Sequence, residues 1–137
     1  MNSALTFTGS PYTSFMHETK VTLSNGIELH VEIGGQPEHP VIMLIMGLGA
    51  QLLFWPDFFC KSLIDQGYRV IRFDNRDIGL SSKIRHSGPR LNTFKLMGRF
   101  ALGLDNQGAP YNLYDMAEDA ALLIDHLELD NVSVLGA

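Results

Sequence analysis

The chain has 137 residues, of which 45% are hydrophobic, and a formal net charge of -5. That length and apolar content suit one domain with a buried core. The 15 acidic residues outnumber the 10 basic ones, and no basic stripe is visible. This balance argues against nucleic acid as the main partner, because phosphate binding needs clustered positive charge.

The sequence also argues against a membrane or secreted protein. The longest apolar run, Val41 to Ala50, is too short to cross a bilayer. Residues 1–16 lack the basic segment and apolar run of a signal peptide. The single cysteine, Cys60, lies in a helix-like stretch and is expected to be a buried structural thiol. We therefore expect a cytoplasmic protein with no membrane partner.

The first predicted element is a β-hairpin. Two alternating segments, Glu18–Leu23 and Ile27–Ile33, flank the pair Asn25-Gly26. An Asn-Gly pair favours a type I′ turn, in which both central residues need positive φ. The domain is therefore expected to span residues 18–137, after an N-terminal extension of residues 1–17.

Strand-like and helix-like segments alternate after the hairpin. Val41–Met46 is an unbroken apolar run, which is typical of a parallel strand covered on both faces. Phe54–Gln66 has helical spacing of its apolar residues, and Gly67 is placed to cap that helix. Tyr68–Phe73 is the next predicted strand.

The second half of the chain begins with a long connection, residues 83–110, that we expect to be partly helical. Asn112 then favours an N-cap, with Asp115 in a box-like arrangement. A short buried strand from Val132 is predicted to run into Gly136-Ala137. The alternation indicates an α/β domain with a mostly parallel sheet, begun by an antiparallel hairpin. The helix after Asn112 carries one apolar stripe, formed by Leu113, Met116, Ala117, Ala120, Leu123, Ile124 and Leu127.

Three glycine-containing loops follow the predicted parallel strands. The first is Met46-Gly47-Leu48-Gly49, the second runs from Asp74 to Ser81, and the third is Gly136-Ala137. Open α/β sheets bind ligands at the carboxyl ends of their strands. We therefore expect these loops to gather at one functional edge.

In order and spacing, the three loops resemble those of the α/β-hydrolase family, from about residue 20 to the C-terminus. That family usually carries H-G-x-G, D-x-R-G-x-G-x-S and G-x-S-x-G after its third, fourth and fifth strands. The segment from Met46 to Asp77 is most similar to bacterial esterase-type members, including aclacinomycin methylesterase-like proteins. The resemblance implies the N-terminal part of an α/β-hydrolase fold with flanking helices. It also implies a serine hydrolase acting on a small-molecule carboxylic ester, with no cofactor.

The resemblance assigns the oxyanion hole to the first loop. One donor is the backbone N–H of Leu48, and the flexible Gly47 and Gly49 let that backbone approach a substrate. The nucleophile would be the residue after Ala137, so residues 1–137 alone are expected to be inactive. The remainder would lie further along the chain or in a second chain.

The other family positions are supporting ones. By resemblance, Asp74, Arg76, Gly79 and Ser81 order the loop under the active site, with Arg76 paired to carboxylates. The aromatic residues that follow the first loop have two open interpretations, as substrate-pocket lining or as plain core packing; they are Phe54 and Trp55.

The chain departs from the family pattern at two positions. Met46 replaces the common histidine, and Asp77 replaces a glycine, although Asp tolerates positive φ better than most residues. We assign no metal and no catalytic histidine, because the base lies far downstream in this family and no histidine pair has metal-ligand spacing. The five histidines are His17, His30, His39, His86 and His126.

Three alternatives remain open. An aspartate at the nucleophile position would indicate an epoxide hydrolase or haloalkane dehalogenase. A dinucleotide-binding half-domain would use Gly47-Leu48-Gly49 and the acid Asp74, but Leu52 occupies its third glycine position. A non-catalytic fragment used as a binding module would leave an apolar strand at a sheet edge, which promotes aggregation.

Overall fold

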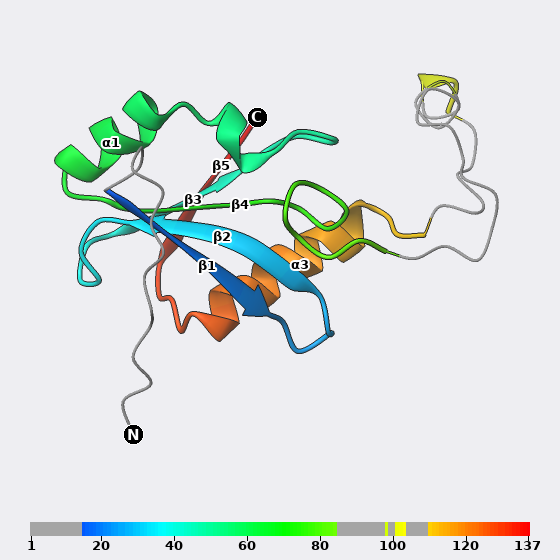
Figure 1. Cartoon of the computed structure of the whole chain (residues 1–137), viewed down its shortest axis with the longest axis horizontal. Helices are drawn as coiled ribbons and strands as arrows, with labels where there is room; N and C mark the ends of the chain where they lie inside the picture. Colours follow the sequence, from blue (N-terminus) through cyan, green and yellow to red (C-terminus); the bar gives the residue numbers. More distant parts are fainter. Residues whose placement is uncertain (1–14, 85–97, 99–100, 104–109) are drawn as a thin grey trace.

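A computed structural model of the chain describes residues 15–84, 98, 101–103 and 110–137. Its centre is a five-stranded sheet in the order β1-β2-β4-β3-β5. β1 pairs antiparallel with β2, and β2 with β4, whereas β3 is parallel to both β4 and β5. The predicted hairpin followed by a parallel sheet is confirmed (Figure 1). The strands are β1 (Met16–Thr22), β2 (Glu28–Gly34), β3 (Val41–Ile45), β4 (Arg69–Phe73) and β5 (Val132–Gly136).

The hairpin turn differs from the predicted type I′ turn. Gly26 has a φ of 85°, but Asn25 is not among the residues with positive φ. The Gly26 N–H donates to the Leu23 carbonyl at 2.9 Å, and the Leu23 N–H donates to the Ile27 carbonyl at 2.8 Å. This is a longer turn that needs one left-handed residue only, as in hairpins closed by a glycine bulge. The prediction was wrong because it assumed that both residues of the pair are central.

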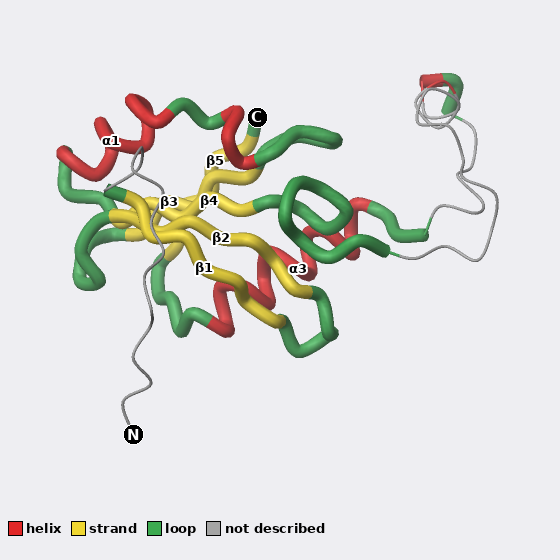
Figure 2. Tube along the Cα trace, viewed as in Figure 1, coloured by secondary structure: helices red, strands yellow, loops and turns green. Residues whose placement is uncertain are grey.

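Two helices cover the sheet, one on each face (Figures 1 and 2). α1 (Asp57–Asp65) begins after Pro56, three residues later than predicted, since a short 3-10 turn, η1 (Leu52–Phe54), precedes it. The C-terminal cap is confirmed: Gly67 has a φ of 88° and donates to the Ile64 carbonyl at 2.9 Å. This is the left-handed ending that glycine favours.

α3 (Leu113–His126) lies on the opposite face and begins as predicted. The Asn112 side chain accepts from the Asp115 N–H at 3.2 Å, and the Asp115 carboxylate accepts from the Asn112 N–H at 2.6 Å. The predicted apolar stripe is buried only in part. Ala120 and Leu123 are buried, whereas Leu113 is exposed, because the first turn of α3 extends beyond the sheet and borders a cavity.

The core has one cluster on each face of the sheet. Cys60, predicted to be a buried thiol, is fully buried on the α1 side. There it packs with Met16, Leu44, Trp55 and Val70. The α3 side holds the larger cluster, formed by Val21, Leu23, Leu29, Val31, Val41, Met43, Ile71, Phe73, Ala120 and Leu123.

The last strand, β5, departs from its predicted burial. It was expected to be a buried strand, but Val134 and Leu135 are exposed. β5 occupies one edge of the sheet and pairs with β3 alone. The Val134 and Leu135 side chains therefore stay exposed, whereas Val132 is partly buried against the α3-side cluster. The helix predicted within residues 83–110 falls largely outside the described residues.

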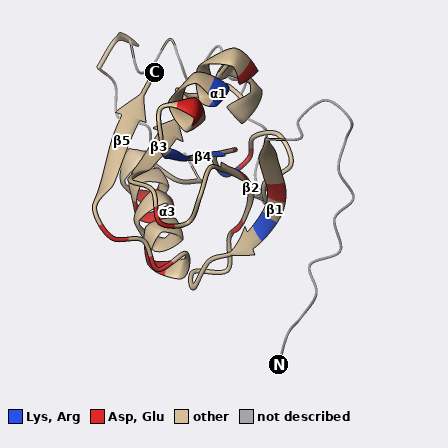
Figure 3. Ribbon diagram, turned by 90° about the vertical axis from the view of Figure 1, so that its left-hand side faces the viewer, with Lys and Arg blue, Asp and Glu red and all other residues tan. Residues whose placement is uncertain are grey.

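Charged residues are spread over α1, β1, β4 and α3 rather than gathered on one element (Figure 3). Among the residues that the structure describes, no helix has the length and apolar composition needed to cross a membrane.

We predict that Leu123→Ala lowers the free energy of unfolding by about 2–5 kcal/mol, because it opens a cavity in the core under α3. The measurement is urea denaturation of the complete protein. Tyr114→Ala is the matched control on the same helix, since Tyr114 is exposed, and it should change the value by about 0.5 kcal/mol or less. Equal effects from the two variants would contradict the assignment of this core.

Candidate functional site

The three glycine-containing loops meet at the carboxyl ends of β3, β4 and β5. A Cβ built on Gly47 would lie 2.7 Å from the Ala137 carbonyl oxygen. Ala137 is held there by its N–H, which donates to the Ile45 carbonyl at 3.2 Å. The Asn75 side chain donates to the Met46 carbonyl at 3.0 Å, which ties the second loop to the first. These contacts place the C-terminus beside the first loop (Figure 1).

The first loop presents its backbone to solvent. The Ala50 N–H donates to the Gly47 carbonyl at 3.2 Å and closes a turn, in which Gly49 has a φ of 79°. The Leu48 side chain is 71% exposed. Within the described part of the chain, the Leu48 N–H has no hydrogen-bond partner. The turn therefore offers a backbone donor next to Ala137.

The carboxylate of Asp74 organises the second loop. One oxygen accepts from the Leu52 N–H at 2.8 Å, and the other accepts from the Leu80 N–H and lies 3.1 Å from His30 Nδ1. Burial disfavours the charged carboxylate, but the hydrogen bonds from His30, Leu52 and Leu80 outweigh it and lower the pKa of Asp74. Asp74 is therefore an ionised group that binds both neighbouring loops.

Gly79 and Ser81 fit closely around Asp74. A Cβ on Gly79 would lie 2.0 Å from an Asp74 carboxylate oxygen, and its φ of 50° already favours glycine. The Ser81 hydroxyl donates to the Asp74 carbonyl at 2.6 Å and accepts from the His30 N–H at 2.9 Å. The positions taken from the family motif thus contact one another directly.

Arg76 connects the second loop to α3. Its guanidinium makes two hydrogen bonds of 2.7 Å to the buried Asp119 carboxylate, and it lies 5.3 Å from the Tyr111 ring centroid. The hydrogen bonds to Asp119 raise the pKa of Arg76. Asn25 also donates to Asp119, at 2.9 Å. This network joins the hairpin turn, the second loop and α3.

Asp77, the departure from the family glycine, has a φ of 66°. Its carboxylate accepts from the Ile84 N–H, and its N–H donates to the Ser82 carbonyl at 2.8 Å. Burial, together with the hydrogen bond to Asp77, raises the pKa of Tyr111 to about 12. The aspartate therefore adopts the left-handed conformation and also binds the end of the loop.

The two aromatic residues after the first loop have different surroundings. Trp55 is 8% exposed and stacks on Phe59, with ring centroids 5.7 Å apart. Phe54 is 70% exposed. The surroundings of Trp55 correspond to the core-packing alternative, and of these two residues Phe54 is the one with an exposed aromatic surface.

Sequence reasoning missed the buried ion network of Arg72. Its guanidinium lies 2.6 Å from Glu32 and 2.9 Å from Asp57, and it donates to the Trp55 carbonyl at 2.6 Å. The sequence did contain a signal for this network, namely a basic residue between apolar residues of a predicted strand. A fully buried charge needs partners. His30 was also missed, since its partner Asp74 is distant in sequence.

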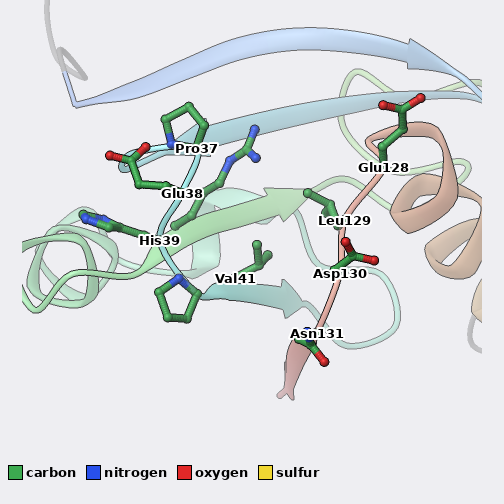
Figure 4. A pocket seen from close by; sticks show the side chains of 10 residues that line it. Pro37, Glu38, His39, Val41, Glu128, Leu129, Asp130 and Asn131 are labelled. Carbon is green, nitrogen blue, oxygen red and sulfur yellow. The ribbon is translucent and has the colours of Figure 1, made fainter.

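Two cavities border the described part of the chain near its loops. One of about 250 Å³ lies beside the first loop, and its lining is almost entirely apolar. The other, of about 420 Å³, lies at the opposite end of the sheet, between the β2–β3 and α3–β5 connections (Figure 4). Among the described residues, no group of three His, Cys, Asp or Glu side chains is arranged to hold a metal ion.

The fold and the loop geometry together define a class. A hairpin followed by alternating strands and helices forms a mixed sheet, and its carboxyl edge carries a glycine turn, an Asp-centred loop and the Gly136-Ala137 end of β5. This arrangement is the N-terminal part of an α/β-hydrolase fold.

Comparisons with known proteins agree with this class, although no family model matches the chain. The chain is 29% identical over 118 residues to rhodomycin D methylesterase of Streptomyces peucetius, covering 86% of this chain and 33% of that protein. It is 42% identical over 60 residues to an AB hydrolase superfamily protein of Bacillus subtilis, covering 44% of this chain and 21% of that protein. A solved hydrolase from Pseudomonas aeruginosa superposes with a TM-score of 0.64 at 26% identity, covering 87% of this chain and 36% of that one.

The chain thus has part of an α/β-hydrolase fold and is similar in sequence to members of the α/β-hydrolase family. It spans about a third of the length of the methylesterase that it matches.

We predict that Asp74→Asn lowers the free energy of unfolding by about 1.5–3 kcal/mol at neutral pH, because it weakens hydrogen bonds to a buried charge. The folded-state pKa of Asp74 lies below its ordinary 3.8. Its stabilisation is therefore present above pH 3.8 and is lost as the pH falls through the lower, folded-state value. The measurement is urea denaturation of both proteins from neutral pH into the acid range.

The control is Asp65→Asn, which removes an exposed partner of Lys61 and should cost about 1 kcal/mol or less. A constant difference between wild type and Asp74→Asn down to the acid limit would contradict the role of the ionised carboxylate.

Proposed function

We propose that the chain is the N-terminal part of a serine hydrolase that cleaves carboxylic esters, and that the Leu48 N–H stabilises the oxyanion. One observation carries this proposal: the Leu48 N–H, which has no partner in the described part of the chain, lies in a turn whose Gly47 packs against the Ala137 carbonyl. In a G-x-S-x-G elbow the nucleophile directly follows the position of Ala137. Donor and nucleophile would therefore face the same substrate carbonyl.

The proposed reaction is acyl transfer through a tetrahedral intermediate. A serine hydroxyl after Ala137 attacks the ester carbonyl while a downstream histidine, oriented by an acid, takes its proton. The ester C–O bond then breaks, the histidine gives the proton to the leaving alcohol, and water hydrolyses the acyl-enzyme by the same route. The negative charge that develops on the carbonyl oxygen is bound by the Leu48 N–H and by the N–H of the residue after the nucleophile. We expect residues 1–137 alone to be inactive, because nucleophile, base and acid would lie outside them in this mechanism.

The described residues would contribute preorganisation. Asp74 fixes the backbone at Leu52 and Leu80, and Asn75 binds the Met46 carbonyl just before the glycine turn. A donor held by such contacts needs little rearrangement when charge develops, which is the source of its catalytic effect. Gly79, Arg76 and Ser81 support the same loop.

We infer a small ester with an apolar part as substrate and the cytoplasm as the location. The exposed side chains of Leu48 and Phe54 offer apolar surface at this edge. The name of the methylesterase relative provides the precedent for a carboxylic ester. The lone, buried Cys60 suits a reducing compartment.

Two observations argue against the dinucleotide-binding alternative. Asp74, the candidate ribose ligand, is buried and already binds His30 and two backbone N–H groups. Leu52, at the third glycine position, is fully buried, so its side chain occupies the space that a glycine would leave open.

We predict that the coding sequence continues past Ala137 with a serine and completes G-x-S-x-G. The complete protein should then react covalently with a fluorophosphonate, whereas residues 1–137 alone should not. Labelling is read by intact-mass spectrometry. An aspartate at that position would instead favour an epoxide hydrolase or dehalogenase. A sequence with no elbow, or NAD(H) binding without labelling, would contradict the proposal.

We predict that Leu48→Pro, which removes the proposed donor, lowers kcat for hydrolysis of a p-nitrophenyl ester by about 10²–10³-fold in the complete protein. Leu48→Ala keeps the N–H and should lower kcat far less. Circular dichroism checks that both variants fold. Similar losses in the two variants would show that the side chain matters rather than the backbone donor.

A further inference from the structure

His30 is a buried residue of β2 whose two ring nitrogens both face carboxylates. Its Nδ1 lies 3.1 Å from an oxygen of Asp74, and its Nε2 lies 2.8 Å from an oxygen of Glu18 on β1. A neutral imidazole has one N–H donor, and an ionised carboxylate can only accept. Both contacts can be hydrogen bonds at once only when the ring is protonated.

Asp74 connects His30 to the loops of the candidate site. The oxygen that faces His30 also accepts from the Leu80 N–H, and the other oxygen accepts from the Leu52 N–H. Leu52 begins η1, shortly after the glycine turn that closes at Ala50, and Leu80 lies in the second loop. A change in the His30–Asp74 contact therefore acts on both loops.

We propose that His30 is a positioning residue whose protonated ring links the β1–β2 hairpin, through Asp74, to the two loops beside the candidate site, and that loss of this proton loosens both loops. The effect on the loops is independent of the reaction. Any effect on catalysis rests on the proposed function.

Other charged groups on the same face of the sheet already have partners. Lys20, which pairs with His30 across the hairpin, is bound to Glu28. Arg72 on β4 is bound to Glu32 and to Asp57 of α1. Within the described residues, Glu18 and Asp74 are thus the carboxylates in direct contact with the ring.

The direction of the pH effect follows from these contacts. The hydrogen bond to Asp74 is the main cause that raises the pKa of His30 above its ordinary 6.5, and Glu18 adds to it, although burial opposes both. A group with a raised pKa stabilises the folded state below its ordinary value and loses that effect as the pH rises through the folded-state value. We therefore expect the loops to loosen in the range above pH 6.5.

The test is an NMR titration of the complete protein that follows the His30 ring together with amide exchange at Leu52 and Leu80. The protection factors of both amides should fall by about tenfold as the ring loses its proton. The pH midpoint of this fall should equal the pH midpoint of the His30 ring titration. A His30 ring that is neutral at pH 6.5 would overturn the proposal. Protection factors that stay constant while the ring titrates would overturn it as well.

Glu18→Gln provides the decisive variant, because Glu18 is half exposed and its loss should leave the fold intact. It should shift both the ring midpoint and the loop midpoint to lower pH by the same amount. Asp65→Asn, a matched change in an exposed pair on α1, should shift neither. Unchanged midpoints in Glu18→Gln would overturn the proposal.

His30→Phe tests the same link without titration. It should lower the protection of the Leu52 and Leu80 amides by about the same factor at pH 6, where wild type is protonated, and remove their pH dependence. Retained pH dependence in this variant would contradict the role of His30. None of these readings requires turnover, so absence of esterase activity would overturn the proposed function and leave this inference standing.

Discussion

The loops beside the candidate site depend on one buried carboxylate, that of Asp74. A buried ionised group is costly unless donors surround it. Asp74 has such donors from three separate segments: the His30 ring on β2, the Leu52 N–H and the Leu80 N–H. Because one group satisfies all three, the segments cannot move independently. The glycine turn, whose Leu48 N–H has no partner among the described residues, lies shortly before Leu52 and is anchored on that side.

The same principle operates on both faces of the sheet. Arg72 is buried on the α1 side between Glu32 and Asp57, and Arg76 joins the second loop to the buried Asp119 of α3. Breaking one partner of such a pair leaves an uncompensated buried charge, which is strongly destabilising. An ion pair therefore binds α1 to β4, and another binds α3 to the loop after β4, in addition to the apolar packing of both helices on the sheet. These contacts limit the movement of the loops at the carboxyl edge.

Local signals made much of this fold predictable. The apolar run of β3, the cap at Gly67 and the box at Asn112 each depend on residues close in sequence. The predicted turn type of the hairpin and the predicted burial of β5 were wrong, and the apolar stripe did not show that Leu113 is exposed, because these features depend on which elements lie nearby in space. For the site, the motifs predicted that the first and third loops would lie at the same edge of the sheet. They gave no sign of the contacts of His30 with Glu18 of β1 and with Asp74, which follows β4.

The central claim is that the Leu48 N–H faces the reacting carbonyl while Asp74 holds the loops around it. A crystal structure of the complete protein after reaction with a phosphonate ester tests this directly. We expect the phosphonyl oxygen at about 2.7–3.1 Å from the Leu48 nitrogen, with the Leu52 and Leu80 N–H groups still bound to Asp74. An adduct formed elsewhere, or a Leu48 N–H directed away from the phosphonyl oxygen, would contradict the account.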